Sequence, residues 1–401
     1  MGPLQGIKVV DITSVLMGPY ATQTLGDFGA DVIKIEAPGG DITRQIGPER
    51  HPGMGPVYLN ANRSKRCIVL DLKRAAGRAV VLRLLTSADV FVTNVRPNAM
   101  RRLQLDYDAV SAVNKKIIYA SLCGFGGDGP YSDKPAYDDL LQGASGLSHL
   151  IARAGDGTPR YTPVALADRV VGLSAVNAIL ASLVQRGASG RGQHVEIPMF
   201  ETMAAFVMGD HMGGLTFEPA LDRGGYARHL APDRKPYRTS DGYICVIVYN
   251  DKQWQSFFKA TGRAYLDADP MFATFASRMA DIDKVYGTLA EILETRTTTE
   301  WLEVLAAADI PVMPMHDLDS LMADPHLVAT DFFALAEHPS EGLIRSMRVP
   351  TRWSETPAKP HRLAPRFGEH SREILEEAAY STAEIEALIA DGTTFSAPPR
   401  G

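Results

Sequence analysis

The first third of the chain alternates short apolar runs with segments in which apolar residues recur at helical spacing. β-Branched residues dominate the apolar runs, as is typical of buried strands. This alternation predicts an α/β fold with a parallel sheet that carries helices on both faces. The predicted strands are 7–13, 31–36, 66–72, 89–95 and 116–126, and the helices between them include 18–30 and 74–88.

An acidic residue interrupts a later apolar segment. The stretch PVALADRVVGLSAVNAILASLV (163–184) holds Asp168 as its single acid, and Val171, Ala175 and Ile179 follow at helical spacing. A carboxylate at the head of a helix can accept hydrogen bonds from backbone amides as an N-cap, worth about 1 kcal/mol. The helix dipole favours its ionised form, which also suits a nucleophile. The spacing alone favours the cap and leaves the nucleophile open.

The pattern changes in the second half of the chain. Residues 215–236 are irregular, and the run YRTSDGYICVIVYN (237–250) predicts a β-hairpin around Asp241-Gly242. Helical segments and a short apolar run at 310–315 follow, which predicts a smaller, separate α+β domain. Near the C-terminus, Ser371 is expected to cap REILEE, and Ser381 or Thr382 to cap AEIEALIA.

Composition narrows the class of protein. The chain has 401 residues, 45% of them hydrophobic, which suits two domains or one domain with a large insertion. Its formal net charge of -6 favours neither nucleic acid nor a membrane as partner. Cys67, Cys123 and Cys245 have no disulfide-framework or zinc spacing, which favours the reducing cytosol. We expect no secretory signal, because the sequence does not begin with a basic region followed by an apolar one. We expect no membrane span, because no run of about 18 apolar residues is present.

Two segments are cationic: 60–73 lies around a predicted strand, and 94–103 lies just beyond another. Ligands of open α/β sheets bind beyond the carboxyl ends of the strands, where Arg and Lys suit phosphorylated ligands. The same spacing of basic residues also fits a charged face exposed to solvent. The spacing alone slightly favours this alternative over a ligand site.

Other motifs give weaker signals. The glycine-rich run GFGGDGP (124–130) lacks the G-x-G-x-x-G spacing, so we expect a turn, with a ligand-proximal loop as the alternative. The sequence contains neither H-E-x-x-H nor G-x-S-x-G, so neither a metal site nor a hydrolase elbow is predicted.

Several distinctive segments occur in an order that identifies a family. They are LQGIKVVDITSVLMGPYATQTLGDFGADVIKIEAPGGD, LNANRSKRCIVLDLK, ADVFVTNVRPNAMRRL, IYASLCGFGGDGPYSDKPAYDDLLQG, GRGQHVEIPMFE, PYRTSDGYI and RFGEHSREILEE. The chain thus resembles the class III CoA-transferases (CaiB/BaiF type), which include formyl-CoA transferase and acyl-CoA racemases. The resemblance implies a Rossmann-like large domain (1–200, completed by 321–401), a linker (201–225), a small α+β domain (226–320) and an interlocked homodimer.

The resemblance also assigns chemistry to residues. It makes Asp168 the nucleophile that forms an aspartyl anhydride and then an aspartyl-CoA thioester, so that CoA moves from an acyl-CoA donor to a free carboxylic acid. CoA is then a substrate, and no tightly bound cofactor or metal is implied. The residues expected to bind it and its acyl group are Leu16, Met17, Leu70, Lys73, Asn94, Val95, Arg96, Arg102, Tyr137 and Asp138.

Two departures from the family pattern bear on the substrate. Formyl-CoA transferase has a glutamine just before its first GP and a glycine-rich lid, whereas this chain has Leu16 and Met17 and no glycine run. These residues disfavour formate and oxalate and favour a bulkier or more apolar acyl group. Tyr137 stands where racemases have a histidine, and a tyrosine with a pKa near 10 is a poor base, which disfavours the racemase alternative. A non-catalytic CoA-binding protein is the third hypothesis. We expect a cytoplasmic CoA-transferase whose partners are acyl-CoA, a carboxylic acid and a second copy of the chain.

Overall fold

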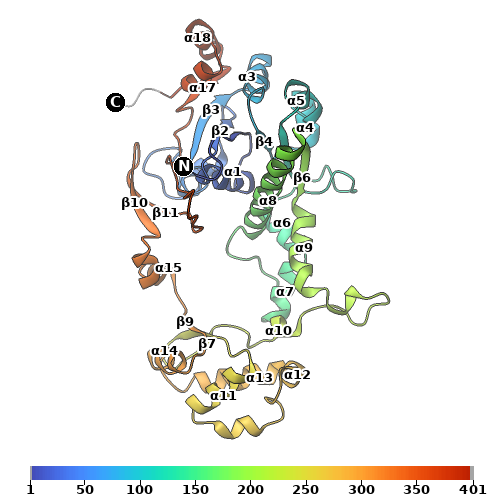
Figure 1. Ribbon diagram of the computed structural model, residues 1–401, viewed down its shortest axis with the longest axis vertical. Coiled ribbons are helices and arrows are strands. Elements are labelled where there is room, and N and C mark those ends of the chain that lie inside the picture. Colours follow the sequence, from blue (N-terminus) through green and yellow to red (C-terminus); the bar gives the residue numbers. More distant parts are fainter. Residues whose placement is uncertain (1, 398–401) are drawn as a thin grey trace. The chain divides into compact units, whose positions relative to one another are not determined.

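The computed structural model describes residues 2–397, which divide into two compact units (Figure 1). Unit 1 contains the described residues up to Ser145, Thr162–Ala205, and the described residues from Val328 onward. Unit 2 contains Gly146–Tyr161 and Phe206–Leu327. The predicted domain boundaries differ from this division in two places. The segment 146–161 belongs to unit 2. The predicted linker begins inside a helix, Met199–His211. Periodicity identifies such a helix but not the core against which it packs.

Unit 1 is built on a seven-stranded sheet in the order β12-β3-β2-β1-β4-β5-β6. The pairs from β3 to β6 are all parallel, whereas β12 pairs antiparallel with β3. The predicted parallel sheet is therefore confirmed, and the strand order 3-2-1-4-5-6 is that of a doubly wound fold. The strands are β1 (Lys8–Asp11), β2 (Asp31–Glu36), β3 (Lys65–Leu70), β4 (Val90–Thr93), β5 (Ile118–Cys123), β6 (His194–Pro198) and β12 (Thr394–Phe395).

Helices cover both faces of this sheet. On one face, alternate residues of β1, β2 and β3 pack with α3, α4, α5, α17 and α18 in a continuous apolar core. On the other face, α1 and α8 pack on each other, α1 against β1, β2 and β4, and α8 against β5 and β6. The helices are α1 (Met17–Asp27), η1 (Ile42–Gln45), α2 (Pro56–Leu59), α3 (Ala75–Leu85), α4 (Pro97–Leu103), α5 (Tyr107–Val113), α6 (Asp138–Ala144), α8 (Leu166–Ser189), α9 (Met199–His211), α17 (Ser371–Glu377) and α18 (Thr382–Ala390).

The helix α8 is long and apolar enough, by length and composition, to cross a membrane. It packs against α1, α6, β5 and β6, and Val171, Ala175 and Ile179 on it are buried. Gly172 allows the close approach to α1, because a Cβ at this position would lie 2.9 Å from the carbonyl oxygen of Met17.

The C-terminal segment completes unit 1. The hairpin β10 (Phe333–His338) and β11 (Gly342–Met347) is antiparallel, and α17, α18 and β12 follow it. Ser381 caps α18 in a capping box with Glu384, as predicted. The predicted cap at Ser371 is wrong: His370 is the N-cap of α17, and the Ser371 hydroxyl donates to the carbonyl of Phe395 at 2.5 Å instead.

Unit 2 has its own core and its own small sheet. The strands β7 (Tyr237–Arg238), β8 (Tyr243–Val246) and β9 (Val312–Pro314) are antiparallel, so the hairpin predicted around Asp241-Gly242 is confirmed. The core is rich in aromatic residues, among them Trp254, Phe257 and Trp301. The helices are α7 (Leu147–Ala154), η2 (Gly213–Thr216), α10 (Ala227–Leu230), α11 (Asp251–Ala260), η3 (Ala264–Ala268), α12 (Phe275–Ala280), α13 (Ile282–Leu293), α14 (Thr298–Ala307) and α15 (Leu318–Met322), followed by α16 (Pro325–Ala329) at the boundary.

Candidate functional site

A cleft of about 430 Å³ lies in unit 1, beyond the carboxyl ends of β1, β4, β5 and β6. The chain leaves β1 toward β2 and β3 on one side and continues from β4 to β5 and β6 on the other, so β1 and β4 flank the switch point of the sheet. Open α/β sheets bind their ligands at this place. The cleft is lined by Ser14, Val15, Met17, Asn94, Val95, Arg96, Pro97, Ala99, Leu122, Cys123, Gly124, Ser132, Lys134, Pro135, Ala136, Tyr137, Asp138, Asp168 and Met199.

Asp168 lies in this cleft, but it does not cap its helix. The N-cap of α8 is Ala165, and Asp168 is the third helical residue. The N-cap interpretation of the sequence pattern is therefore wrong by three positions. Within residues 2–397, neither oxygen of the Asp168 carboxylate has a hydrogen-bond or ion-pair partner, although the side chain is half-buried. An unpartnered carboxylate in a cleft is available to a ligand.

A second carboxylate holds the backbone of Asp168 in place. The Asp168 amide donates to Oδ1 of Asp138 at 2.9 Å, and Gln142 Nε2 donates to Oδ2 of Asp138 at 2.5 Å. The Gln142 side chain is fully buried, and its Oε1 accepts from the amide and the hydroxyl of Thr162 at 2.8 and 2.9 Å. A relay of Thr162, Gln142 and Asp138 thus connects the segment before α8, the helix α6 and the first turn of α8.

Burial and the neighbouring Asp138 carboxylate raise the pKa of Asp168 to about 7, against the opposing effect of Arg169. The Arg169 guanidinium lies over the ring of Tyr20, 4.4 Å from its centroid. We expected the helix dipole to favour the ionised form of Asp168, but desolvation and a like charge outweigh any such effect. A carboxyl with a strongly raised pKa in a cleft is a candidate functional group.

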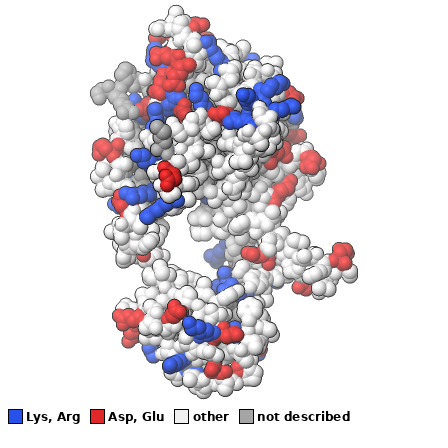
Figure 2. All heavy atoms as spheres, in the orientation of Figure 1, with Lys and Arg blue, Asp and Glu red and all other residues white. Residues whose placement is uncertain are grey.

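The structure gathers most, but not all, of the predicted binding residues. Met17, Asn94, Val95, Arg96, Tyr137 and Asp138 line the cleft together with Asp168. Leu16, Leu70, Lys73 and Arg102 are not among the lining residues. Leu16 and Leu70 are buried in the core, whereas Lys73 and Arg102 are exposed. Figure 2 shows Lys and Arg side chains gathered over α4, the helix that carries Arg102.

The glycine-rich turn after β5 is internally satisfied. The amide of Gly126 donates to Glu201 at 2.9 Å and that of Gly127 to Glu196 at 2.8 Å, so these amides are not free to hold a phosphate. Gly124 nevertheless shapes the cleft, because a Cβ there would lie 2.4 Å from the Cβ of Ala136. The two alternatives for this run therefore combine: it is a turn, and one of its glycines forms part of the cleft wall.

Sequence reasoning missed several cleft residues. Val15, Cys123, Lys134 and Met199 line the cleft, and only their positions just after strands or in the loop before α6 could have marked them. Cys123 is not a rival nucleophile, since burial and two nearby glutamates raise the pKa of its thiol to about 12.

Comparisons with known proteins agree with this geometry. The model of CoA-transferase family III matches residues 4–371. A succinate–glutarate CoA-transferase of Agrobacterium fabrum is 35% identical over 94% of this chain and 95% of its own length. A formyl-CoA:oxalate CoA-transferase of Streptomyces avermitilis is 33% identical over 97% and 98%. The crystal structure of a CaiB/BaiF family protein from Brucella suis superposes with a TM-score of 0.80 and 32% identity, covering 94% of this chain and 99% of that one. The chain therefore belongs to CoA-transferase family III and is an enzyme that acts as an acyl-CoA:carboxylate CoA-transferase.

Proposed function

We propose that Asp168 is the nucleophile that carries the acyl group and then CoA during the transfer. The observation that supports this role is its unpartnered, half-buried carboxylate in the cleft at the switch point of the sheet. The carboxylate attacks the carbonyl carbon of the donor thioester, the C–S bond breaks, and CoA leaves as a thiolate. The product on the enzyme is a mixed anhydride of Asp168 and the acyl group.

Three further exchanges complete the transfer. The CoA thiolate attacks the aspartyl carbonyl of the anhydride, which releases the donor acid and leaves an aspartyl-CoA thioester. The acceptor carboxylate attacks that thioester, forming a second anhydride and CoA thiolate again. The thiolate then attacks the acceptor carbonyl, so that the new acyl-CoA forms and Asp168 is free. Each step exchanges one activated acyl bond for another, so no external energy source is needed.

The electrostatics of Asp168 favour these covalent states. Desolvation and the Asp138 charge disfavour the ionised carboxylate, which is why its pKa is raised to about 7. Acylation removes the same negative charge that protonation removes. The features that raise the pKa therefore also favour the anhydride and the thioester relative to the free carboxylate.

The remaining predicted residues receive supporting roles in this proposal. Asn94, Val95 and Arg96, beyond β4, contact the CoA portion of the ligand together with Lys134 on the opposite loop. Lys73 and Arg102 bind the more distant phosphates with their exposed charges, and the strand end at Leu70 lies beneath this path. Met17 and Tyr137 flank the acyl group, while Leu16 supports Met17 from the core.

We further propose a short dicarboxylate, of the size of succinate or glutarate, as one of the two acids. Val15, Met17 and Met199 give the cleft apolar walls for a methylene chain of this length. The name of the relative from Agrobacterium fabrum supports this class. The name of the relative from Streptomyces avermitilis supports formate and oxalate, which the bulky Met17 side chain at the cleft disfavours.

One experiment tests the nucleophile and the substrate together. The enzyme is incubated with a panel of acyl-CoA donors and acids, and the acyl-CoA products and hydroxylamine-trapped protein are measured by mass spectrometry. We expect new acyl-CoA only with both substrates present and a hydroxamate on Asp168. Exchange of the α-proton with deuterated water in the absence of an acceptor would instead support the racemase, and CoA binding without exchange would support the non-catalytic protein.

The interlocked homodimer is a separate part of the proposal. Exposed apolar side chains on α8 and α9, such as Leu173, Val184 and Phe206, suit contact with a second copy. Sedimentation velocity is expected to give a dimer that does not dissociate on dilution, and a concentration-independent monomer would exclude it.

A further inference from the structure

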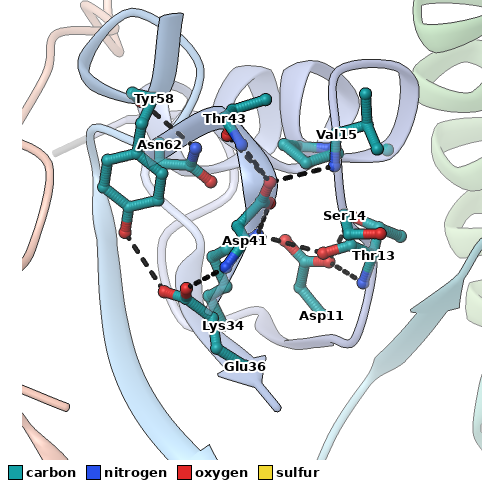
Figure 3. Close-up of polar contacts among 12 residues, drawn as sticks. Asp11, Thr13, Ser14, Val15, Lys34, Glu36, Asp41, Thr43, Tyr58 and Asn62 are labelled. Carbon is teal, nitrogen blue, oxygen red and sulfur yellow. Dashed lines mark hydrogen bonds and ion pairs between the residues drawn. The ribbon is translucent and has the colours of Figure 1, made fainter. Parts of the chain in front are cut away.

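The turn between β1 and α1 has an unusual backbone. Val15 has a φ of 70°, in the left-handed region that β-branched residues rarely adopt. Its side chain is 39% exposed and lines the cleft that also contains Asp168. Figure 3 shows the Val15 side chain pointing away from the charged groups beneath the turn. A strained residue at a cleft wall needs a structural feature that holds it there.

A buried ion pair holds this turn from below. Lys34 Nζ lies 3.0 Å from Asp41 Oδ2, and both side chains are almost completely excluded from solvent. Lys34 Nζ also donates to the carbonyl of Thr13 at 3.0 Å, and Oδ1 of Asp41 accepts the amide of Val15 at 3.3 Å. The two charged groups thus bind the backbone on both sides of Ser14 (Figure 3).

Two further contacts leave the turn little freedom. The Asn94 side chain accepts from the amide of Ser14 at 3.1 Å and donates to its carbonyl at 2.9 Å. Gly18 packs directly on Thr13, since a Cβ at Gly18 would lie 2.3 Å from the Thr13 Cβ. The conformation at Val15 is therefore imposed by tertiary contacts, against the local preference of a valine.

Asp41 is itself locked in place. Its Oδ1 also accepts the amide and hydroxyl of Thr43, at 3.0 and 2.8 Å, and its own amide donates to Glu36 at 2.9 Å. Buried ion pairs add little net stability compared with apolar residues of the same volume, so a positional role is a better explanation for such a pair than stability.

We propose that the Lys34–Asp41 ion pair is a positioning device for Val15, and that Val15 in turn sets the size of the acyl group that the cleft accepts. This inference rests on the proposed function only in that the cleft holds the acyl portion of an acyl-CoA. The ion pair touches no substrate, so Lys34 and Asp41 are positioning residues, whereas Val15 is a specificity-determining residue.

The test compares acyl selectivity among variants. Binding of acetyl-, propionyl-, butyryl-, isobutyryl- and succinyl-CoA is measured by calorimetry, and kcat and KM are measured for each donor. Val15→Gly removes the side chain and accepts the left-handed backbone freely, so the ratio of kcat/KM for the larger to the smaller donors should change by about tenfold. Asp41→Asn should change the same ratio in the same direction, although residue 15 is still valine.

Thr43→Val is the matched control. It removes one hydroxyl that donates to Asp41 but keeps the amide of residue 43 and the Lys34–Asp41 ion pair that hold this carboxylate, so it should lower the melting temperature and leave the donor ratios unchanged. In the Val15→Gly background, Asp41→Asn should have no further effect on the ratios, since no side chain remains to be positioned.

The possible outcomes separate this inference from the proposed function. If Asp41→Asn lowers stability but keeps the wild-type ratios, the ion pair is only structural and the positioning role is wrong. If Asp41→Asn does not fold, Val15→Gly still decides the role of the side chain: unchanged ratios would overturn the inference. If the wild type binds acyl-CoAs selectively but transfers none, the transferase mechanism fails while the selectivity test still holds.

Discussion

Asp11 and Asp168 are carboxylates of the same unit with opposite surroundings. Asp11 ends β1 and is completely buried, yet it accepts hydrogen bonds from the amide and hydroxyl of Thr13, from Thr22 and from Lys65. Burial alone would raise its pKa, but Lys65, Lys34 and the hydroxyls outweigh burial and lower it. Asp168 is less buried, its carboxylate has no such partner among the residues that the structure describes, and its pKa is raised to about 7.

The difference shows that burial by itself does not decide what a carboxylate does. A buried carboxylate whose oxygens are all satisfied is held in its ionised form and serves the fold. A carboxylate that lies in a cleft without donors, beside a like charge, gains from any reaction that neutralises it. Four experiments test whether these surroundings determine the roles of the two carboxylates.

Asp168→Ala should have the largest effect. Loss of the nucleophile should reduce CoA transfer by about 10⁴-fold or more and abolish the hydroxylamine-trapped adduct. Asp139→Asn is the control, since this neighbouring acid of α6 is exposed and does not line the cleft. Both variants are assayed by acyl-CoA exchange. Near-normal exchange by Asp168→Ala would show that another group carries the acyl chain.

Asp11→Ala should instead damage the fold. It leaves the Lys65 ammonium buried without its carboxylate, which should lower the free energy of unfolding by about 3–5 kcal/mol. Asp31→Asn breaks an ion pair with Arg66 in which the Asp31 side chain is 41% exposed. This change should lower the free energy of unfolding by about 1 kcal/mol or less. Urea denaturation measures both. Equal losses would mean that burial does not distinguish these pairs.

The charge of Asp138 should be visible in the pH dependence of acylation. Because acylation needs ionised Asp168, its rate should rise through pH values near 7 in the wild type. The double variant Asp138→Asn/Gln142→Glu can keep the hydrogen bonds that residues 138, 142, 162 and 168 make with one another while moving the negative charge away from Asp168. It loses the 3.5 Å hydrogen bond from Gln142 Nε2 to the carbonyl of Val164. We expect the acid limb of the trapping rate to move to lower pH by about one unit.

The single variant Asp138→Asn is the comparison for this experiment. It removes the same charge but places an amide against Gln142 Nε2, so it should also misplace the turn and lower the maximal rate. An acid limb that stays at the wild-type pH in the double variant would mean that burial alone raises the pKa of Asp168.

Asp168 should also leave a small signature in stability. Its folded pKa lies above the unfolded value of 3.8, so the unfolded state ionises first and this group destabilises the fold increasingly as pH rises from about 4 to 7. Asp168→Asn should therefore match the wild type at pH 4 and be more stable by about 1–2 kcal/mol at pH 8. Thermal unfolding across this range measures the difference, and a less stable variant at pH 8 would contradict the raised pKa.

Much of the scaffold could be predicted from short-range patterns. The strand and helix alternation, the Asp241-Gly242 hairpin and the cap at Ser381 are all properties of a few adjacent residues. The two failures both concern helix caps, which a short stretch of sequence suggests but does not decide. The Ser371 hydroxyl donates to the carbonyl of Phe395 instead of capping α17. Asp168 is not a cap, because α8 already begins at Leu166.

The candidate site was predicted only in part, because some of its residues act through contacts with distant parts of the chain. Family segments placed Met17, Asn94, Arg96, Tyr137, Asp138 and Asp168 at one ligand, and the structure brings these residues to one cleft. No pattern indicated the buried Gln142 or the strained Val15, because their roles depend on contacts with distant parts of the chain.

The sequence alone is sufficient to predict the alternation of strands and helices, the family and the acid near the start of α8. Those depend on local periodicity and on ordered segments of the chain. The tertiary structure sets the neighbours of each carboxylate: Asp11 lies against Lys65, whereas within residues 2–397 the Asp168 carboxylate forms no ion pair and lies near Asp138. The charge state of a carboxylate depends on which groups lie within a few ångströms of it, and folding sets those distances between residues far apart in the sequence.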